Sequence, residues 1–359
     1  MNKNSSDFER SINRAMKILL IGGTGIISTA VSKALLEQGH ELWLINRGNQ
    51  NHLLPGGARF ITADIEDFDC VSQKLPPIMF DCVADFVVQK PEHIVRDYHL
   101  FYGKTRHYIF ISSGSVYQKP LSHYEVTEST PLYNPYWDYA QNKIACENKL
   151  MEIYRATGFP ITIIRPGHTY DNKWLPLAIS GWHGCYSVVK RMLDGRPTII
   201  PGDGTSLWTV THNSDFAKAF LGIVGNPSAI GEAVNISSDE VLTWNQIYQT
   251  IAEALGVELS PFYVSSMFLH QAGPYDFKCC LIGERAQSIV YRNEKLKRLV
   301  PGFYAQVPFR DGIRKSLQFL LSHPEYQEAD PVFDHWCDTL IESLTLTASR
   351  IKKEFPKCK

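Results

Sequence analysis

The segment from Met16 to Arg47 constrains the fold more than any other part of the chain. A short apolar run, Ile18 to Ile21, is typical of a buried strand and leads into a turn of small residues, Gly22-Gly23-Thr24-Gly25. Apolar residues at helical spacing continue as far as Gly39, and a second apolar run, Leu42 to Ile45, follows. The pattern predicts a βαβ unit with its glycines where strand becomes helix.

Such a junction is suited to binding the pyrophosphate of a dinucleotide. The first amides of the helix are unpaired there and attract an anion. The spacing is Gly22-x-x-Gly25-x-x-Ser28, with serine in place of the third small residue. A purely structural turn is the alternative. We predict dinucleotide binding, with contacts from Gly22, Gly23, Thr24, Gly25, Ile26 and Ile27.

The composition limits the other possibilities. The chain has 359 residues, of which 44% are hydrophobic, and a formal net charge of −1, so nucleic-acid binding through charge alone is not expected. The eight cysteines include no CxxC pair, which favours reduced thiols in a cytoplasmic protein without a metal site. No apolar run reaches the ~18 residues of a membrane span. We expect residues 1–15 to be a flexible tail.

Apolar runs separated by helical segments continue through the first half of the chain. They predict a Rossmann-type, doubly wound parallel sheet over residues 16–170, with further strands at 59–65, 81–88, 107–112 and 161–165. We expect residues 171–325 to form mostly a smaller α/β substrate lobe, with some segments returning to the main sheet, and 326–359 to form a C-terminal helical extension. In the second half, helices are predicted at 186–193, 211–224 with Ser214 as its cap, 243–255 and 310–321, and a strand at 233–237.

Two strand ends would contact the adenosine half of the cofactor. Asn46 stands where a carboxylate usually binds the ribose, and Arg47 follows it. A cation suits a 2′-phosphate better than a bare diol, so we predict NADP, with NAD as the alternative. Arg47 as a solvated loop residue also remains open. Asp64, followed by Ile65, could accept a hydrogen bond from the adenine amino group.

The second informative stretch is Tyr139-Ala-Gln-Asn-Lys143, in which the tyrosine and lysine share a helical face. A lysine near a tyrosine hydroxyl is expected to lower the tyrosine pKa, so that the phenol can exchange a proton with a substrate hydroxyl. The serines of residues 112–117, SSGSVY, could hold the substrate oxygen.

These motifs, with ADI at 63–65, RPG at 165–167 and PGDGTS at 201–206, resemble those of the extended and atypical short-chain dehydrogenases/reductases, the NAD(P)-dependent epimerase/dehydratase group. The resemblance implies that Tyr139 is the acid/base, Lys143 its electrostatic partner and Ser113 the ligand of the reacting oxygen, with Ser112 and Ser115 as competitors. It places Phe86 and Pro166 in the cofactor pocket. His168 could face the nicotinamide or be structural.

The chain also departs from the family pattern. Gly114-Ser115 replaces the Asp-Glu pair of sugar-nucleotide 4,6-dehydratases, so that elimination is not expected. No arginine follows Gly202-Asp203-Gly204 to grip a substrate diphosphate. Lys190, Arg191 and Arg292 are the candidates to take its place. Trp182, His183 and Trp208 could form an aromatic wall of the site or simply pack in the lobe.

The expected function is an NAD(P)-dependent oxidoreductase of the sugar-nucleotide epimerase type. One alternative is an NADPH-dependent reductase of a non-nucleotide carbonyl compound. Another is a catalytically silent nucleotide- or RNA-binding protein on the same fold, like chloroplast stem-loop RNA-binding relatives. The partner would be a small-molecule substrate, with no membrane contact. By resemblance, a homodimer formed through the tyrosine-bearing helix and the helix before it is expected.

Overall fold

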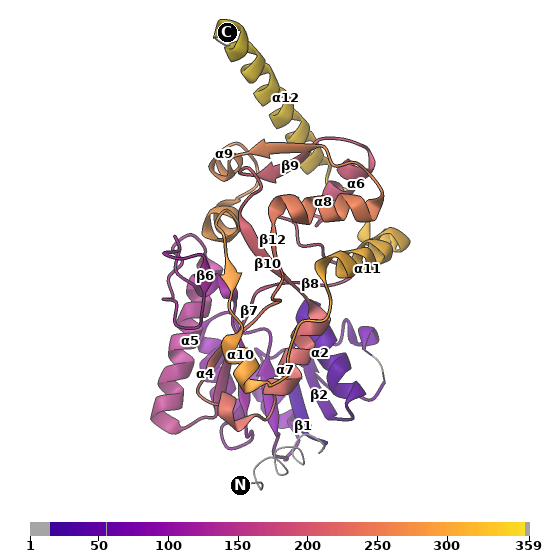
Figure 1. The fold of residues 1–359 in the computed structure, drawn as a ribbon. Helices are drawn as coiled ribbons and strands as arrows, with labels where there is room; N and C mark the ends of the chain where they lie inside the picture. Colours follow the sequence, from indigo (N-terminus) through magenta and orange to yellow (C-terminus); the bar gives the residue numbers. More distant parts are fainter. Residues whose placement is uncertain (1–14, 55, 356–359) are drawn as a thin grey trace.

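The computed structural model describes residues 15–54 and 56–355, so the tail predicted at 1–15 lies outside the described residues except for Ala15. Figure 1 shows the sheet and its helices at one end, a smaller lobe above them, and a last helix that projects beyond the lobe.

The central sheet has seven strands in the order β11-β7-β5-β4-β1-β2-β3, and every pairing within it is parallel. Successive strands are added on one side of β1 and then on the other, which creates a switch point beside β1 where ligands of such sheets bind. This confirms the predicted fold class. The strands are β1 (Lys17–Ile21), β2 (Glu41–Asn46), β3 (Arg59–Thr62), β4 (Cys82–Asp85), β5 (Tyr108–Ile111), β7 (Ile161–Pro166) and β11 (Ala233–Ile236).

Helices cover both faces of this sheet. The apolar sides of α2 and α7 share one buried cluster with strand residues such as Leu20, whereas α4 and α5 share the opposite cluster with residues such as Leu19. Neighbouring strand residues point to opposite faces, which explains why nearly all the strand side chains are apolar. The helices of this part are α2 (Ile26–Glu37), α3 (Phe68–Lys74), α4 (Pro91–Phe101), α5 (Asp138–Thr157), α7 (Asn213–Ile223) and α10 (Glu294–Leu299).

Local differences from the sequence predictions concern element ends. The third and fourth strands are shorter than predicted, because the chain leaves the sheet at Thr62 and at Asp85 to form the walls of a cleft. The predicted cap of the 211–224 helix was wrong: the His212 side chain accepts from the backbone N–H of Ser214, which therefore lies inside the first turn. The Thr243 cap of α8 is confirmed, since its side chain accepts from the Gln246 N–H.

The lobe is built from small sheets and helices. Its strands are β6 (Glu125–Val126), β8 (His168–Tyr170), β9 (Thr198–Pro201), β10 (Leu207–His212), β12 (Val241–Thr243), β13 (Pro261–Val264) and β14 (Val290–Tyr291). Its helices are α6 (Tyr186–Leu193), α8 (Trp244–Leu255), α9 (Ser266–Gln271), α11 (Phe309–Ser322), α12 (Pro331–Glu354) and the π-helical turn η4 (Lys278–Arg285). Short 3₁₀ turns are η1 (Asn51–Leu53), η2 (Gly114–Val116), η3 (Pro227–Ala229) and η5 (Pro324–Tyr326).

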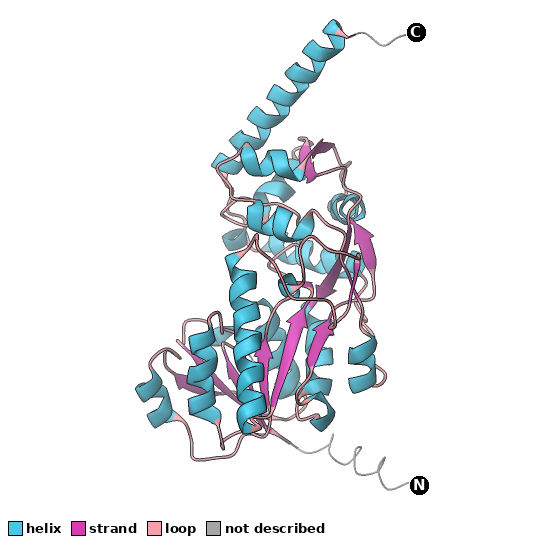
Figure 2. Ribbon diagram, turned by 90° about the vertical axis from the view of Figure 1, so that its left-hand side faces the viewer, coloured by secondary structure: helices cyan, strands magenta, loops and turns pink. Residues whose placement is uncertain are grey.

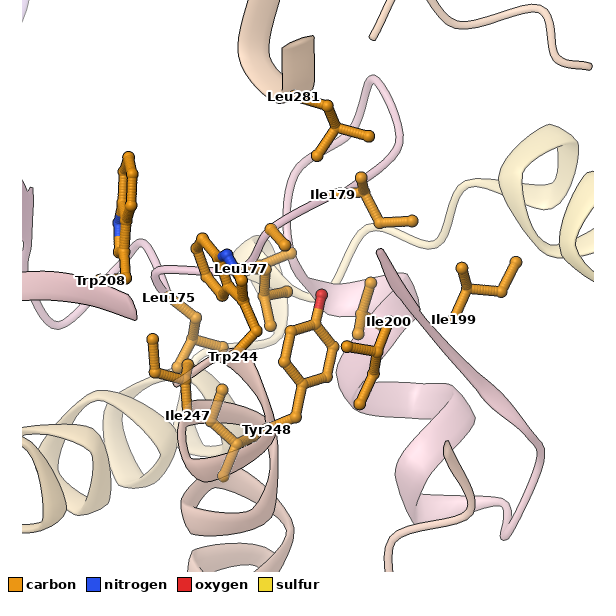
Figure 3. Packing of buried hydrophobic residues seen from close by; sticks show 14 of the residues in the cluster. Leu175, Leu177, Ile179, Ile199, Ile200, Trp208, Trp244, Ile247, Tyr248 and Leu281 are labelled. Atoms are coloured by element: carbon orange, nitrogen blue, oxygen red, sulfur yellow. The ribbon is translucent and has the colours of Figure 1, made fainter. Parts of the chain in front are cut away.

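Trp208 belongs to the core of the lobe. Figure 3 shows it beside Trp244, and their rings are stacked with centroids 5.5 Å apart. Trp182 is exposed, and His183 pairs with Glu328. None of the three predicted aromatic candidates lines the cleft described below, so packing accounts for Trp208. None of the helices within residues 15–54 and 56–355 is long and apolar enough to cross a membrane.

Candidate active site

A cleft of ≈ 1040 Å³ opens at the carboxyl ends of the central strands, beside the switch point. It is lined by fifteen of the sixteen residues predicted from sequence to form the site, and Gly23 is the exception. The fifteen are Gly22, Thr24, Gly25, Ile26, Ile27, Asn46, Arg47, Asp64, Ile65, Phe86, Ser113, Tyr139, Lys143, Pro166 and His168.

The glycines of the turn serve different purposes. Gly22 has φ +81°, and a Cβ on it would lie 2.4 Å from Val87 Cγ1, so only glycine fits. A Cβ on Gly23 would lie 2.2 Å from Leu44 Cδ2, inside the contact between strand and helix. Gly23 therefore keeps β2 and the turn close together, and its predicted cofactor contact is not supported. A Cβ on Gly25 would contact only Ser28 Oγ, at 3.4 Å, so the protein itself leaves room there.

The start of α2 is suited to an anion. No side chain caps its first amides, and the first turn contains no acidic residue. Ser28 Oγ accepts from the Gly25 N–H at 2.8 Å, so the serine at the third small-residue position closes the turn. Together with the open space at Gly25, these features fit the pyrophosphate of a dinucleotide.

Asn46 and Arg47, at the end of β2, line the cleft in different environments. The Asn46 side chain is occupied by its own loop, because its Oδ1 accepts from the Gly48 N–H at 2.9 Å and its Nδ2 donates to Asn51 at 2.8 Å. Arg47 is exposed and makes no ion pair with the described residues. Asp64 also lines the cleft, and its Oδ1 accepts from the Glu66 N–H at 3.1 Å.

The tyrosine and lysine lie one turn apart on α5. Lys143 Nζ donates to the carbonyl oxygens of Val88 and Ile111 at 2.6 and 2.8 Å, and lies 5.6 Å from the centre of the Tyr139 ring. Burial lowers the pKa of Lys143 to about 8, against the opposing influence of Asp85.

The pKa of Tyr139 differs from the sequence expectation. Burial raises it, the neighbouring Ser113 side chain lowers it, and the charge of Glu284 raises it further. The expected lowering by Lys143 is not seen, because burial is the largest influence and the ammonium is directed at two backbone carbonyls.

The three competing serines have distinct environments. Ser112 Oγ donates to Glu147 at 2.5 Å, and Glu147 in turn binds Arg165 in a buried ion pair. Ser115 is fully buried, and both its backbone N–H and its hydroxyl donate to Ser113 Oγ, at 3.2 and 2.8 Å. Since Ser113 Oγ accepts from Ser115, its own proton remains for a group in the cleft.

The residues of the cleft that the sequence analysis did not predict include Trp137, Glu284 and Arg285. The last two come from η4, which is joined to the serine loop by Asn134, whose Nδ2 donates to the carbonyls of Ser115 and Gly283. Burial raises the pKa of Glu284, although the nearby cations Arg285 and Lys119 lower it. A π-helical turn leaves no recognisable periodicity in the sequence.

Arg285 is a cation of the cleft that the sequence analysis did not predict. Arg191 is buried against Asp334 and Asp338, Lys190 pairs with Asp194, and Arg292 pairs with Glu125 and Glu294, so none of the three predicted substitutes lines the cleft. Arg285 Nη1 donates to the carbonyl of Ala178 at 2.9 Å, which fixes its position.

His168 lines the cleft as a neutral side chain. Burial lowers its pKa to about 3, and the charge of Arg285 lowers it further. Its Nε2 is buried without a partner among the described residues. No group of three or more potential metal ligands occurs in residues 15–54 and 56–355.

Comparison with known proteins places the chain in a family. The model of the NAD dependent epimerase/dehydratase family matches residues 18–237. This chain belongs to that family. It is a family of NAD-dependent enzymes, and the resemblance inferred from the motifs is thereby confirmed.

Two curated relatives show how similar the chain is to individual proteins. The chain is 28% identical over 262 residues to the chloroplast stem-loop binding protein of 41 kDa b of Arabidopsis thaliana, covering 68% of this chain and 65% of the relative. It is 24% identical over 252 residues to 2'-dehydrokanamycin reductase of Streptomyces kanamyceticus, covering 69% of each. The chain thus spans about two thirds of the length of these curated relatives.

The fold matches a solved UDP-glucuronic acid 4-epimerase from Bacillus cereus, in complex with UDP-glucuronic acid and NAD. The TM-score is 0.67 at 21% identity, over 86% of this chain and 99% of that one.

Proposed function

We propose that this chain is an NAD(P)-dependent oxidoreductase of the epimerase type that acts at a hydroxyl or ketone carbon of a nucleotide sugar. The observation that carries the proposal is that one cleft joins the glycine turn, the Tyr139–Lys143–Ser113 group and Arg285. A bound nicotinamide would supply a hydride acceptor and donor there. The glycine turn would hold its pyrophosphate, and Asp64 its adenine.

In this proposal Tyr139 exchanges the proton of the reacting oxygen. Because burial raises its pKa, the phenol is protonated at neutral pH and is ready to donate to a carbonyl oxygen. The reverse direction requires Tyr139 to accept the hydroxyl proton. Ser113, whose oxygen already accepts from Ser115, donates its own proton to the same substrate oxygen and so orients it.

Arg285 is proposed to bind the substrate diphosphate. Replacing Arg285 with glutamine should weaken UDP binding by roughly 10- to 100-fold, the value of a charge-assisted hydrogen bond. NADH affinity should change little. Arg292→Gln is the matched control, since Arg292 lies outside the cleft. Titration calorimetry with UDP measures both, and equal UDP affinity in the two variants would contradict this role.

Arg47 is proposed to select NADP. In an Arg47→Ala variant we expect the affinity for NADPH to fall about tenfold or more, the loss of one charge-assisted phosphate contact. NADH affinity should stay within twofold, because the exposed Arg47 side chain has no other ion-pair partner in the described residues. Fluorescence titration with both cofactors distinguishes this from a solvated loop residue, for which neither affinity would change.

Lys143 makes the cofactor site pH-dependent. Two of its three ammonium protons are used by backbone carbonyls, which leaves one for the cofactor. Since its pKa is about 8, NADH affinity should fall as the pH rises through that value. The lowered pKa means that Lys143 binds more protons in the unfolded state between about 8 and 10.5. The contribution of Lys143 itself to stability therefore rises with pH there and does not cause the loss of affinity.

A comparison of two lysines tests this pH dependence. The Lys119 pKa is also about 8 through burial, but Lys119 does not line the cleft. In NADH titrations between pH 6.5 and 9.5, the affinity of Lys119→Met should still fall as the pH rises, whereas the affinity of Lys143→Met should not depend on pH in this way. The decline surviving in Lys143→Met would refute the assignment.

The second candidate is a net reductase of a non-nucleotide carbonyl compound. A specific observation favours it, namely the similarity to 2'-dehydrokanamycin reductase over most of the chain. The stem-loop binding relative makes an RNA-binding role the third outcome. Against that role stand the three reactive side chains gathered in one cleft and the net charge of −1.

The experiment is to incubate the protein with NAD or NADP and a panel of UDP- and dTDP-sugars, and to separate the products by chromatography. An epimeric sugar without net change of cofactor supports the proposal. In a parallel incubation with NADPH and a non-nucleotide ketone, stoichiometric consumption of NADPH supports the reductase. Salt-sensitive RNA binding without any turnover would overturn both.

A further inference from the structure

The cleft is formed by two parts of the chain that are distant in sequence. Ser113 and Tyr139 belong to the sheet domain, the part built on the seven-stranded sheet, whereas Arg285 comes from η4 of the lobe. Figure 2 shows the strands of the sheet ending at the lobe, which is where the cleft lies. Turnover requires both parts to hold one substrate in a single alignment, because a displacement of about 1 Å can cost about 10²-fold in rate. A residue that joins the two parts at this point would control the rate without touching the substrate.

Asn134 joins them through both polar atoms of its side chain. Its Nδ2 donates one proton to the carbonyl of Ser115 and the other to the carbonyl of Gly283, each at 2.9 Å. Its Oδ1 accepts from the backbone N–H of Tyr136 at 3.2 Å. The three partners lie in the serine loop, in η4 and just before α5. One side chain therefore holds the three segments that carry the reacting serine, the reacting tyrosine and the diphosphate cation.

This junction is buried and closely packed. Asn134 is 1% exposed, so water does not readily replace its hydrogen bonds, and its loss would leave buried carbonyls unpaired. A Cβ on Gly283 would lie 3.1 Å from Tyr136 Cβ and 3.4 Å from Asn134 Oδ1. Glycine thus allows the backbone of η4 to approach the segment before α5, and the hydrogen bonds of Asn134 fix that approach.

The lobe holds Arg285 by separate contacts. Its Nη1 donates to the carbonyls of Leu177 and Ala178, and its own carbonyl accepts from Trp244 Nε1 at 3.0 Å. These bonds orient the guanidinium within the lobe, whereas the bonds of Asn134 set η4 against the sheet domain. We infer that Asn134 is a positioning residue, which aligns the cation of the lobe with the serine and tyrosine hydroxyls across the cleft. The inference rests on the function proposed for this cleft.

Asn226 offers a matched control. Like Asn134, it precedes a proline, and its Oδ1 accepts from the backbone N–H two residues later, that of Ser228, at 3.0 Å. Its Nδ2 donates to a carbonyl distant in sequence, that of Leu299, at 2.8 Å. It is 7% exposed and does not line the cleft. Alanine at either position removes the same kind of buried amide, so a difference in turnover between the variants reports on position rather than on stability.

The first test separates turnover from binding. In Asn134→Ala, kcat should fall about tenfold or more, whereas the affinities for NADH and for UDP, measured separately by calorimetry, should stay within about threefold. The reason is that the glycine turn and the bond from Arg285 to Ala178 are untouched. Asn226→Ala should keep native kcat. Native kcat in Asn134→Ala, or an equal fall in both variants, would overturn the inference.

Gly283→Ala reaches the junction from the other side and leaves Asn134 in place. The added methyl meets Tyr136 Cβ, which is attached to a backbone that Asn134 holds, so η4 must shift. A fall in kcat with native NADH and UDP affinities is expected here too. Native kcat in Gly283→Ala would contradict the inference even if Asn134→Ala could not be purified in folded form.

Amide hydrogen exchange tests the junction without a substrate. Peptides covering residues 113–117 and 278–285 should exchange faster in Asn134→Ala than in the native chain, and at the native rate in Asn226→Ala. A native chain without any turnover would refute the proposed function, and faster exchange in these two segments would still support the junction. Unchanged exchange in both segments of Asn134→Ala would overturn the inference.

Discussion

Replacing Tyr139 with phenylalanine is expected to lower kcat by roughly 10²- to 10⁴-fold, the usual contribution of a positioned acid/base. The variant removes the proton that the buried phenol would exchange with the substrate oxygen. The ring should keep its place, because it lies against Trp137 with centroids 5.2 Å apart. Dinucleotide affinity and melting temperature should therefore stay close to those of the native chain, and steady-state kinetics with the best sugar of the panel measures the loss.

Tyr136→Phe is the matched control for this variant. Tyr136 lies three residues earlier in the chain, and its side chain does not line the cleft. Native kcat is expected for Tyr136→Phe. Native kcat for Tyr139→Phe would show that another group exchanges the proton, and Glu284 would then be the first alternative because it lies in the same cleft.

A pair of glycine variants separates cofactor binding from folding. Alanine at Gly25 should weaken NAD(P)H binding by about tenfold or more, equivalent to at least 1.4 kcal/mol, at an unchanged melting temperature. The added methyl meets only Ser28 Oγ in the protein, at 3.4 Å, and the backbone of Gly25, with φ −85°, suits alanine. Any loss must therefore come from the space that the cofactor would occupy.

Alanine at Gly23 should instead destabilise the fold. Its methyl would lie 2.2 Å from Leu44 Cδ2, between buried elements, and overpacking of this kind typically costs about 1–3 kcal/mol. Chemical denaturation should show a lower free energy of unfolding for Gly23→Ala and no change for Gly25→Ala. If both variants lost stability equally, Gly25 would be a structural glycine and the proposed role of the turn would fail.

The sequence was most informative where function depends on neighbouring residues. The glycine turn, the Tyr139–Lys143 spacing and the serine-rich strand end are local patterns, and the parallel sheet brings them together because its strands all end at one edge. The choice among three serines could only be argued by resemblance from the sequence. The structure decides this choice, because the Ser112 hydroxyl donates to Glu147 and the Ser115 hydroxyl donates to Ser113, which leaves the Ser113 proton free.

Features formed by distant segments were not predictable. Arg285 reaches the cleft from η4, held there by Asn134, and neither the π-helical turn nor this contact leaves a sequence pattern. The predicted lowering of the Tyr139 pKa was wrong for a related reason. A pattern of two residues gives their spacing on a helix, but burial and the charge of Glu284 depend on the assembled lobe.

The central claim is that this cleft binds a dinucleotide for hydride transfer. The most direct measurement is to denature the purified protein, identify any released nucleotide by mass, and titrate the emptied protein with NADH and NADPH. The account predicts a released NAD(H) or NADP(H), or saturable binding of a reduced cofactor that Gly25→Ala weakens. No released dinucleotide and no affinity for either cofactor would contradict it.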